Sequence, residues 1–316
     1  MDGIYEEDYI SICLEYANRL LQQSMPVIFD LEHIKKILKL NECDMYAYHK
    51  FKIYAGVKER EISSPSRKIK SRQRWILDNI LGNITIHESA HGFVKGKSIV
   101  TNAREHIGQY EMLNIDIKNF FDSINSNEVA RVFRNIGYTE EVINKLTEIC
   151  TFDNVLPKGA PTSPCLSNII CLPIDVQLKE LADTYNLKYT RYADDMTFSG
   201  ERIINTVRES INNIINKQGF ELNTNKTRYV KGNKRKMVTG IVVGDKLRVP
   251  KRFKRKLKQD IYYCQRFGAG KHLENINATR YINFRSYMYG RAYFVKMVEE
   301  KVGEKYLNEL DLINWN

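Results

Sequence analysis

The sequence lacks the features that would indicate a membrane or secreted protein. None of its 316 residues belongs to a stretch approaching the about 18 apolar residues that a membrane-spanning helix requires. The N-terminus opens with acids and has no basic leader. Its six cysteines form no C-x-x-C pair, so we expect reduced thiols in a cytoplasmic protein that has no membrane partner. The chain also contains no internal repeat and no low-complexity linker.

The positive charge is unevenly distributed. The chain carries 49 Lys and Arg against 38 Asp and Glu, a net charge of +11. Residues 226–266 alone hold fifteen Lys or Arg and only two acids, Asp245 and Asp260. Such a block suits a polyanion, because each neutralised phosphate releases counterions. A solvated basic face or a disordered tail is the alternative, but apolar residues between the charges favour a folded basic helix.

Hydrophobic periodicity predicts a mixed α+β protein. Apolar residues recur at helical spacing in the first fifty or so residues, and a basic amphipathic helix is expected near 68–81. Residues 110–117 alternate like a strand, and 190–199 resemble two short strands around a polar turn. Helical spacing returns in 164–182 and in 203–215, where Gly219 ends the second pattern.

Three carboxylates stand at places that suit catalysis. Tyr192-Ala193-Asp194-Asp195 puts two adjacent acids between apolar strands, and Asp116 ends another predicted strand. Neighbouring carboxylates repel one another, and a hard divalent cation would relieve that repulsion. If the two strands are neighbours, Asp116 and Asp194 can share two metal ions for in-line phosphoryl transfer. Alone, each motif is more often a solvated turn, so the inference depends on their order along the chain.

In that order, these blocks resemble the reverse transcriptases over roughly residues 60–243. Tyr192–Asp195 matches the Y-x-D-D signature, whereas viral RNA-copying polymerases usually have G-D-D. Asn114–Ile124 resembles the first palm block. The resemblance implies an RNA-directed DNA polymerase with two Mg²⁺ ions, for which Mn²⁺ is a possible substitute. Asp116, Asp194, Asp195 and the backbone carbonyl of Ile117 would be the metal ligands.

The same resemblance assigns roles around the incoming nucleotide. Phe121 falls on the steric-gate position that excludes a ribose 2′-hydroxyl. Leu156–Pro164 resembles the L-P-Q-G-x-x-x-S-P block, with Lys158 in place of the family's Gln before Gly159. Lys226 matches a palm lysine proposed to protonate pyrophosphate. The family's fingers grip the triphosphate at the positions of Arg60 and Arg67. An exposed turn lysine and a generally basic stretch are the plainer interpretations of these last three residues.

Two short motifs narrow the resemblance to bacterial retron reverse transcriptases. Asn102-Ala103-Arg104-Glu105-His106 fits N-A-x-x-H, and Val238-Thr239-Gly240 fits V-T-G, each in the expected place. Local packing of His106 and an ordinary strand ending at a glycine are the structural alternatives. We expect these residues to contact RNA or DNA. The basic thumb segment is expected to do the same through Lys251, Arg252, Lys254 and Arg255.

The retron resemblance implies several partners. The enzyme would copy part of a cognate structured non-coding RNA into multicopy single-stranded DNA, primed from a guanosine 2′-hydroxyl and using dNTPs. The product would be an RNA–DNA hybrid whose template a host ribonuclease H trims. The resemblance also implies antiphage defence with an effector protein. Only 76 residues follow Gly240, which we expect to form a thumb without a ribonuclease H domain.

The expected architecture is a right-hand polymerase with fingers, palm and thumb, preceded by a helical N-terminal extension. The predicted divisions are an extension at 1–55, fingers at 56–109, a first palm part at 110–125, a connection at 126–165, a second palm part at 166–243 and a basic helical thumb at 244–316.

Alternative functions stay open at this point. One is a free-standing reverse transcriptase related to group II introns, and another is a non-catalytic RNA-binding antitoxin scaffold. A third is an RNA-copying polymerase. His87–His91 also matches the zinc-protease pattern H-E-x-x-H. That pattern requires a helix, and the β-branched residues before it and Gly92 after it argue against one.

Overall fold

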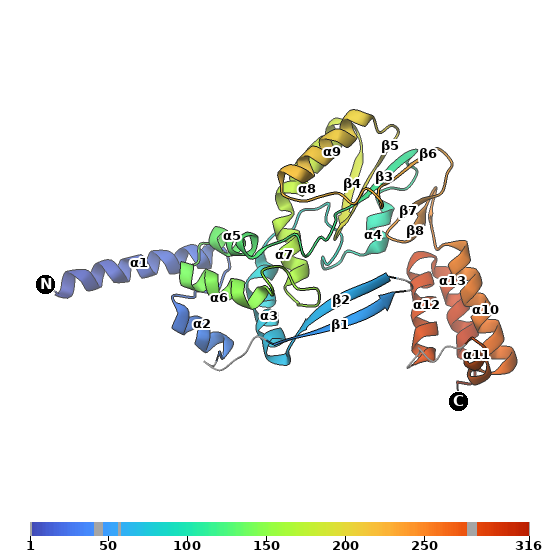
Figure 1. Cartoon of the computed structure of the whole chain (residues 1–316), viewed down its shortest axis with the longest axis horizontal. Coiled ribbons are helices and arrows are strands. Elements are labelled where there is room, and N and C mark those ends of the chain that lie inside the picture. Colours follow the sequence, from blue (N-terminus) through green and yellow to red (C-terminus); the bar gives the residue numbers. More distant parts are fainter. Residues whose placement is uncertain (1, 41–46, 56–57, 277–282, 316) are drawn as a thin grey trace.

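The protein is an elongated molecule with a palm, fingers, a thumb and an N-terminal helical extension (Figure 1). The computed structural model describes residues 2–40, 47–55, 58–276 and 283–315. Within these ranges, the side chains of 2–7, 54, 55, 58 and 60 lie outside the description. The combination of helices with antiparallel strands agrees with the predicted α+β class.

The palm is built on a four-stranded antiparallel sheet with the spatial order β4-β5-β3-β6. Because side chains alternate along a strand, Leu113 and Ile115 of β3 enter the hydrophobic core while Asn114 and Asp116 point to the opposite face. The predicted strands at 110–117 and 190–199 are confirmed. The palm strands are β3 (Glu111–Asp116), β4 (Lys188–Tyr192), β5 (Asp195–Gly200) and β6 (Arg228–Lys231).

Helices cover the core side of this sheet (Figure 1). Ile174 and Leu178 of one helix, and Val207 and Ile211 of another, are buried at helical spacing in the same core as the strands. The helical patterns at 164–182 and 203–215 are thereby confirmed. The helices around this core are α5 (Ser126–Ile136), α6 (Glu140–Cys150), α7 (Ser163–Ile170), α8 (Leu172–Thr184) and α9 (Asn205–Lys217).

The fingers combine a long hairpin with short helices. The hairpin strands β1 (Tyr48–Ala55) and β2 (Lys58–Pro65) pair antiparallel from end to end. The predicted boundary at residue 55 therefore cuts a hairpin, and the helical extension ends before Tyr48. The helix predicted near 68–81 is α3 (Arg67–Asn79). It is followed by the short helices η1 (Leu81–Asn83) and α4 (Ile99–Arg104).

The N-terminal extension consists of α1 (Asp2–Gln22) and α2 (Leu31–Leu38). Helix α1 projects away from the rest of the molecule (Figure 1). Its helical spacing was correctly predicted, yet Ile10 and Leu14 are more than half exposed, and among the described side chains of this helix only Leu20 is fully buried. The periodicity therefore predicted the helix but not the burial of its apolar face.

A small three-stranded sheet links the palm to the thumb. Its strands are β7 (Lys236–Val238), β8 (Ile241–Val243) and β9 (Leu247–Arg248). The thumb that follows has its own hydrophobic core, in which Leu257, Ile261 and Cys264 recur at helical spacing. The basic segment is thus a folded helix, as predicted. The thumb helices are α10 (Lys251–Phe267), α11 (Ala269–Asn275), α12 (Phe284–Val298) and α13 (Glu300–Asp311).

Candidate active site

The strand register brings the predicted catalytic carboxylates together. Asp116, at the end of β3, is the register partner of Asp195, the first residue of β5. Asp194 lies in the two-residue turn between β4 and β5, and its carbonyl oxygen accepts a 3.1 Å hydrogen bond from the backbone N–H of Ile117. Residues nearly eighty positions apart thus meet at one end of the palm sheet, as the sequence predicted.

The three acids form a strongly acidic site. Loss of solvation by the surrounding protein, together with the charges of Asp194 and Asp116, raises the pKa of Asp195 to about 6, although the side chain keeps solvent access. The side chain of Asp116 is only 7% exposed. The Nζ atom of Lys226 donates to its two carboxylate oxygens at 2.6 and 2.7 Å. The ammonium group of Lys226 thus occupies the carboxylate of Asp116, where the resemblance to reverse transcriptases predicts a metal ion.

This donor set fits a hard divalent cation. Carboxylate oxygens of Asp116, Asp194 and Asp195 are the ligand type that Mg²⁺ prefers. Their mutual repulsion raises the pKa of Asp195 and would be relieved by a cation, and Asp116 already holds a positive group. Within the described residues, no three His, Cys, Asp or Glu side chains are close enough together to hold a metal ion as they stand. Both carboxylate oxygens of Asp116 are bonded to Lys226, so metal binding at Asp116 requires Lys226 to move.

A cavity of about 370 Å³ opens beside the carboxylates. Besides Asp116 and Asp195, its wall includes the cations Lys226, Arg228 and Arg235, which suit the phosphates of a nucleic acid or nucleotide. The remaining lining residues are Asn114, Ile115, Met196, Thr197, Val230, Met237, Thr239 and Gly240.

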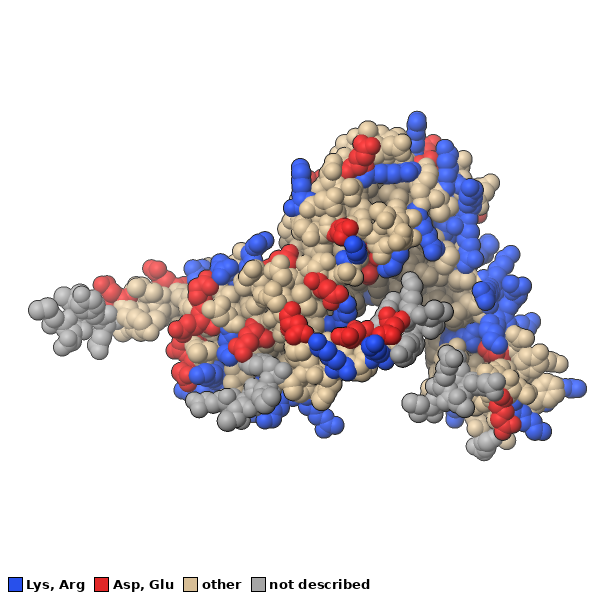
Figure 2. Space-filling model, in the orientation of Figure 1, with Lys and Arg blue, Asp and Glu red and all other residues tan. Residues whose placement is uncertain are grey.

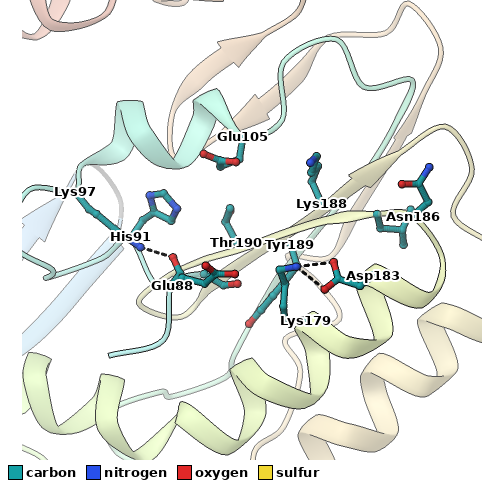
Figure 3. Close-up of a pocket in the computed structure, with 12 residues that line it drawn as sticks. Glu88, His91, Lys97, Glu105, Lys179, Asp183, Asn186, Lys188, Tyr189 and Thr190 are labelled. Carbon is teal, nitrogen blue, oxygen red and sulfur yellow. Dashed lines mark hydrogen bonds and ion pairs between the residues drawn. The ribbon is translucent and has the colours of Figure 1, made fainter. Parts of the chain in front are cut away.

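A second cavity of about 370 Å³ lies on another part of the palm and includes none of the three predicted catalytic acids (Figure 3). Its three lysines, Lys97, Lys179 and Lys188, are balanced by three acids, so it has no marked preference for a polyanion. The cavity beside Asp116 is therefore the better candidate for the reaction site.

The nucleotide block, residues 156–164, which is predicted to lie beside the incoming nucleotide, contacts the fingers hairpin. The carbonyl oxygen of Lys158 accepts a 3.0 Å hydrogen bond from the N–H of Ser63. Gly159 has φ +134°, and a Cβ atom there would lie 2.9 Å from the carbonyl oxygen of Ser63, so no larger residue fits without movement. The Nζ atom of Lys158 lies 2.5 Å from the Oδ2 atom of Asp122, which directly follows the partly buried Phe121.

The comparisons with known proteins agree with this geometry. A family model described as reverse transcriptase (RNA-dependent DNA polymerase) matches residues 55–254. The retron Ec86 reverse transcriptase of Escherichia coli is 31% identical, over 93% of this chain and 98% of that protein. The retron Mx162 reverse transcriptase of Myxococcus xanthus is 30% identical over 80% of this chain, but only 58% of its own length is covered.

The chain belongs to the retron reverse transcriptases. It is an RNA-directed DNA polymerase that acts on an RNA template, and enzymes of this family use divalent metal ions. A solved telomerase from Candida albicans shares 10% identity, with a TM-score of 0.48, over 98% of this chain and 67% of that one.

The two retron signatures are largely buried in this reverse transcriptase. His106 is fully buried, and its ring nitrogens lie 2.6 Å from Ser199 Oγ and 2.8 Å from Thr190 Oγ1. Burial lowers the pKa of His106 to about 3, with smaller contributions from His91 and Lys188, so the imidazole is neutral. The side chains of Asn102 and Val238 are also buried. Their packing favours the structural alternative, and any effect of these three residues on RNA would be indirect.

The second signature also forms a tight turn at the active-site cavity. Thr239 and Gly240 connect β7 to β8 with φ values of +44° and +85°, as a two-residue hairpin turn of the primed type requires. Both residues line the cavity beside Asp116. Thr239 Oγ1 also donates to the carbonyl oxygen of Ile99, so the turn contacts the helix that carries the first signature. Of the signature residues predicted to contact RNA or DNA, only Thr239 and Gly240 are not buried.

The predicted basic residues differ in their surroundings. Lys251, Arg252 and Arg255 of α10 are exposed, and Lys and Arg are frequent on the thumb side of the molecule (Figure 2). Lys254 instead forms two 2.8 Å contacts with Glu299, which fastens α10 to the start of α13. Arg67 is exposed at the start of α3.

Two further sequence motifs have simple outcomes. Arg60 belongs to β2, but its side chain lies outside the described part of the structure, so its triphosphate contact stays a prediction. The H-E-x-x-H stretch is not helical. Its two histidines therefore do not share a helix face, and the zinc-protease interpretation is excluded as expected. Among the described residues, no helix is long and apolar enough to cross a membrane.

Sequence reasoning missed a buried polar network behind the catalytic turn. Arg191 and Asp175 are both fully buried and form an ion pair of 2.5 Å. Arg191 was part of a strand pattern and Asp175 part of a helix pattern, so neither drew attention. No signal in the single sequence relates a charge on a strand to a charge on the preceding helix. The pairing became visible only when the helix packed against the sheet.

Proposed function

We propose that this enzyme copies part of a cognate structured non-coding RNA into multicopy single-stranded DNA by a two-metal mechanism. The supporting observation is the meeting of Asp116, Asp194 and Asp195 at the end of the palm sheet, beside a cavity lined with cations. Two Mg²⁺ ions held there would activate the attacking hydroxyl and stabilise the leaving pyrophosphate, and Mn²⁺ is a possible substitute.

In this proposal, Asp116 and Asp194 are the principal ligands, and Asp195 and the carbonyl group of Ile117 complete the site. Lys226 has two successive partners. Its ammonium group pairs with the carboxylate of Asp116 in the structure. During turnover it leaves that carboxylate and donates a proton to the pyrophosphate. The half-exposed side chain of Lys226, at the mobile end of a four-carbon stem, suits such an exchange.

We propose that residues of the palm and fingers select and hold the incoming dNTP. Phe121, which packs edge-on against Phe120 with ring centroids 5.4 Å apart, would block a ribose 2′-hydroxyl. Lys158 would exchange Asp122 for the triphosphate, because both partners of that ion pair are about 40% exposed and such pairs are weak. Gly159, Arg60 and Arg67 would complete the phosphate contacts.

Priming from a guanosine 2′-hydroxyl would give a branched RNA–DNA product, whose hybrid the thumb would hold. Lys251, Arg252 and Arg255 are exposed and would contact phosphates, whereas Lys254 would act by fixing α10. Host ribonuclease H would trim the template. We further propose that the complex works in antiphage defence with an effector protein, in the cytoplasm.

The test is to express the gene with its flanking DNA and to extract nucleic acid. A short single-stranded DNA whose mobility shifts on ribonuclease treatment is expected from the wild type and not from an Asp194→Asn, Asp195→Asn variant. DNA synthesis on a primed RNA template without that product would instead favour a free-standing enzyme related to group II introns. A normal phage-defence phenotype in the variant would favour the non-catalytic RNA-binding scaffold.

A further inference from the structure

The Arg191 guanidinium is held in the interior by matched partners. Its Nε and Nη2 atoms donate to Oδ1 and Oδ2 of Asp175 at 2.8 and 2.5 Å, a two-pronged pair between β4 and α8. Tyr189 donates to the same carboxylate at 2.7 Å. Burying two charges costs much of what their attraction returns, so an apolar pair would stabilise the fold as well. The pair therefore calls for a role other than stability.

The remaining nitrogen of Arg191 reaches the catalytic turn. Its Nη1 atom donates to the carbonyl oxygen of Ala193 at 3.3 Å and to Oδ1 of Asn168 at 2.9 Å. Ala193 directly precedes Asp194 and has φ +56°, in the left-handed region that residues with a Cβ atom disfavour. Arg191 thus bonds to the backbone of a turn whose conformation needs outside support.

A strap formed by residues 88–92 supports the same strand from the side. The backbone N–H of Arg191 donates to the carbonyl oxygen of Ser89, and its carbonyl oxygen accepts from the N–H of His91, each at 2.7 Å. Lys97 also bonds to the strap by donating to the carbonyl oxygen of Glu88 (Figure 3) and to that of Ala90. The strap is therefore held to β4 at Ser89 and His91 and to Lys97 at Glu88 and Ala90.

The end of the strap touches the turn itself. A Cβ atom added to Gly92 would lie 2.6 Å from the backbone nitrogen of Ala193 and 3.1 Å from the carbonyl carbon of Tyr192. Only glycine allows this approach, since the atoms that it meets belong to the backbone and cannot turn away. The carbonyl oxygen of Gly92 accepts a 2.9 Å hydrogen bond from Nδ2 of Asn168. Asn168 therefore bridges Arg191 and the strap.

Asn168 also connects the turn to the nucleotide block. It lies on α7, which begins at Ser163 within that block. Ser163 Oγ donates to the carbonyl oxygen of Pro157 at 2.8 Å, so the block and the helix are joined. A continuous path of hydrogen bonds and helix runs from the residues beside the incoming nucleotide to the turn that carries Asp194.

We infer that Arg191, Asp175 and Asn168 are positioning residues that set the conformation of the Ala193 turn and so place Asp194 to bind metal. The inference rests on the proposed metal-binding role of Asp194. The network touches no reacting atom, and it acts by holding the backbone on which a ligand is mounted. Gly92 belongs to the same unit because its lack of a side chain lets the strap approach the turn closely.

The test replaces the buried ion pair by apolar residues of similar size. Asp175→Leu with Arg191→Met is made in a Tyr189→Phe background, so that no hydroxyl is left without an acceptor. Tyr189→Phe alone is the matched control, because it weakens the same network without touching Ala193. Retained thermal stability would show that the apolar variant folds, as expected for exchange of a buried ion pair.

Three quantities are measured on the full chain: Mn²⁺ affinity by electron paramagnetic resonance, the Mg²⁺ dependence of kcat, and the KM for dNTP at saturating Mg²⁺. In the triple variant, Mn²⁺ affinity should fall about tenfold or more and kcat should drop, while KM for dNTP changes little. The Tyr189→Phe control should bind Mn²⁺ like the wild type. Gly92→Ala, which displaces the turn with the ion pair intact, should reproduce the loss of Mn²⁺ affinity.

Unchanged Mn²⁺ affinity and Mg²⁺ dependence in a folded triple variant would overturn the positioning role. A loss of Mn²⁺ affinity that is equal in Tyr189→Phe would overturn it too, because the effect would then follow general loosening of the core. Asp194→Asn, measured beside them, separates the two levels of the proposal. If it leaves wild-type Mn²⁺ affinity unchanged, the metal site itself is wrongly assigned and the inference falls with it.

Discussion

Acidification should destabilise this reverse transcriptase through two buried histidines. His106 accepts or donates hydrogen bonds only to the hydroxyl groups of Ser199 and Thr190, and burial lowers its pKa to about 3. His91, whose Nδ1 lies 2.9 Å from Thr101 Oγ1, has its pKa lowered to about 4 by burial and by the nearby Lys97. Both imidazoles are therefore neutral in the folded protein throughout the pH range 5–7.

The sign and size of the effect follow from proton linkage. An unfolded histidine takes up a proton near pH 6.5, whereas each folded one does so only near pH 3 or 4, so the unfolded state binds more protons between these values. The free energy of unfolding is thus intact above about pH 6.5 and falls as the pH decreases. At about pH 5, each histidine should have removed about 2 kcal/mol relative to pH 7.5, since one pKa unit corresponds to about 1.4 kcal/mol.

The assay is urea denaturation at several pH values, comparing wild type with His106→Gln, whose amide can replace the hydrogen bonds but does not titrate. The variant is expected to start less stable at neutral pH and to lose about 2 kcal/mol less than wild type on going to about pH 5. Carboxylates contribute equally to both proteins and cancel in the difference. If the two stabilities fall in parallel, His106 is not a buried neutral histidine, and the packing assigned to the N-A-x-x-H signature is wrong.

Three further outcomes are expected. Asp194→Asn should lower the rate of DNA synthesis by a factor on the order of a thousand without loss of folding, because metal ligation supplies several kcal/mol of transition-state stabilisation. Primer extension would measure the rate and circular dichroism the folding, and a rate within a few-fold of the wild type would contradict the prediction. Phe121→Ala should raise ribonucleotide incorporation relative to dNTP by about ten- to a hundredfold in competition assays, and an unchanged ratio would remove its gate role. Asp260→Ala should destabilise the thumb by about 3–5 kcal/mol, because this buried carboxylate contacts Arg291 at 2.7 Å, His272 at 3.2 Å and Lys256 at 3.0 Å. Limited proteolysis would detect the loss of thumb stability, and protection equal to that of the wild type would refute the prediction.

The elements that carry the chemistry were predictable because their signals are local. Alternation along β3 and around the Asp194 turn, and helical spacing in α7, α8 and α9, depend only on near neighbours in the chain. The predicted boundary at residue 55 falls inside the hairpin. Polar and apolar residues alternate over 50–53, but this stretch is too short to define the ends of a strand, and the extent of β1 follows from its pairing with β2. Strand pairing is a non-local interaction that periodicity does not register.

The order of the conserved blocks, the basic thumb helix and the family could be recognised from the amino-acid sequence, because motifs and charge are properties of the chain. Folding was needed to reveal that His106 is buried between two hydroxyl groups, that Lys226 pairs with Asp116, and that Arg191 bonds to the Ala193 turn. Each of these depends on which side chains meet after folding. A residue type states what a side chain can bond to, but burial and its partners, set by packing of distant segments, decide which bond it makes.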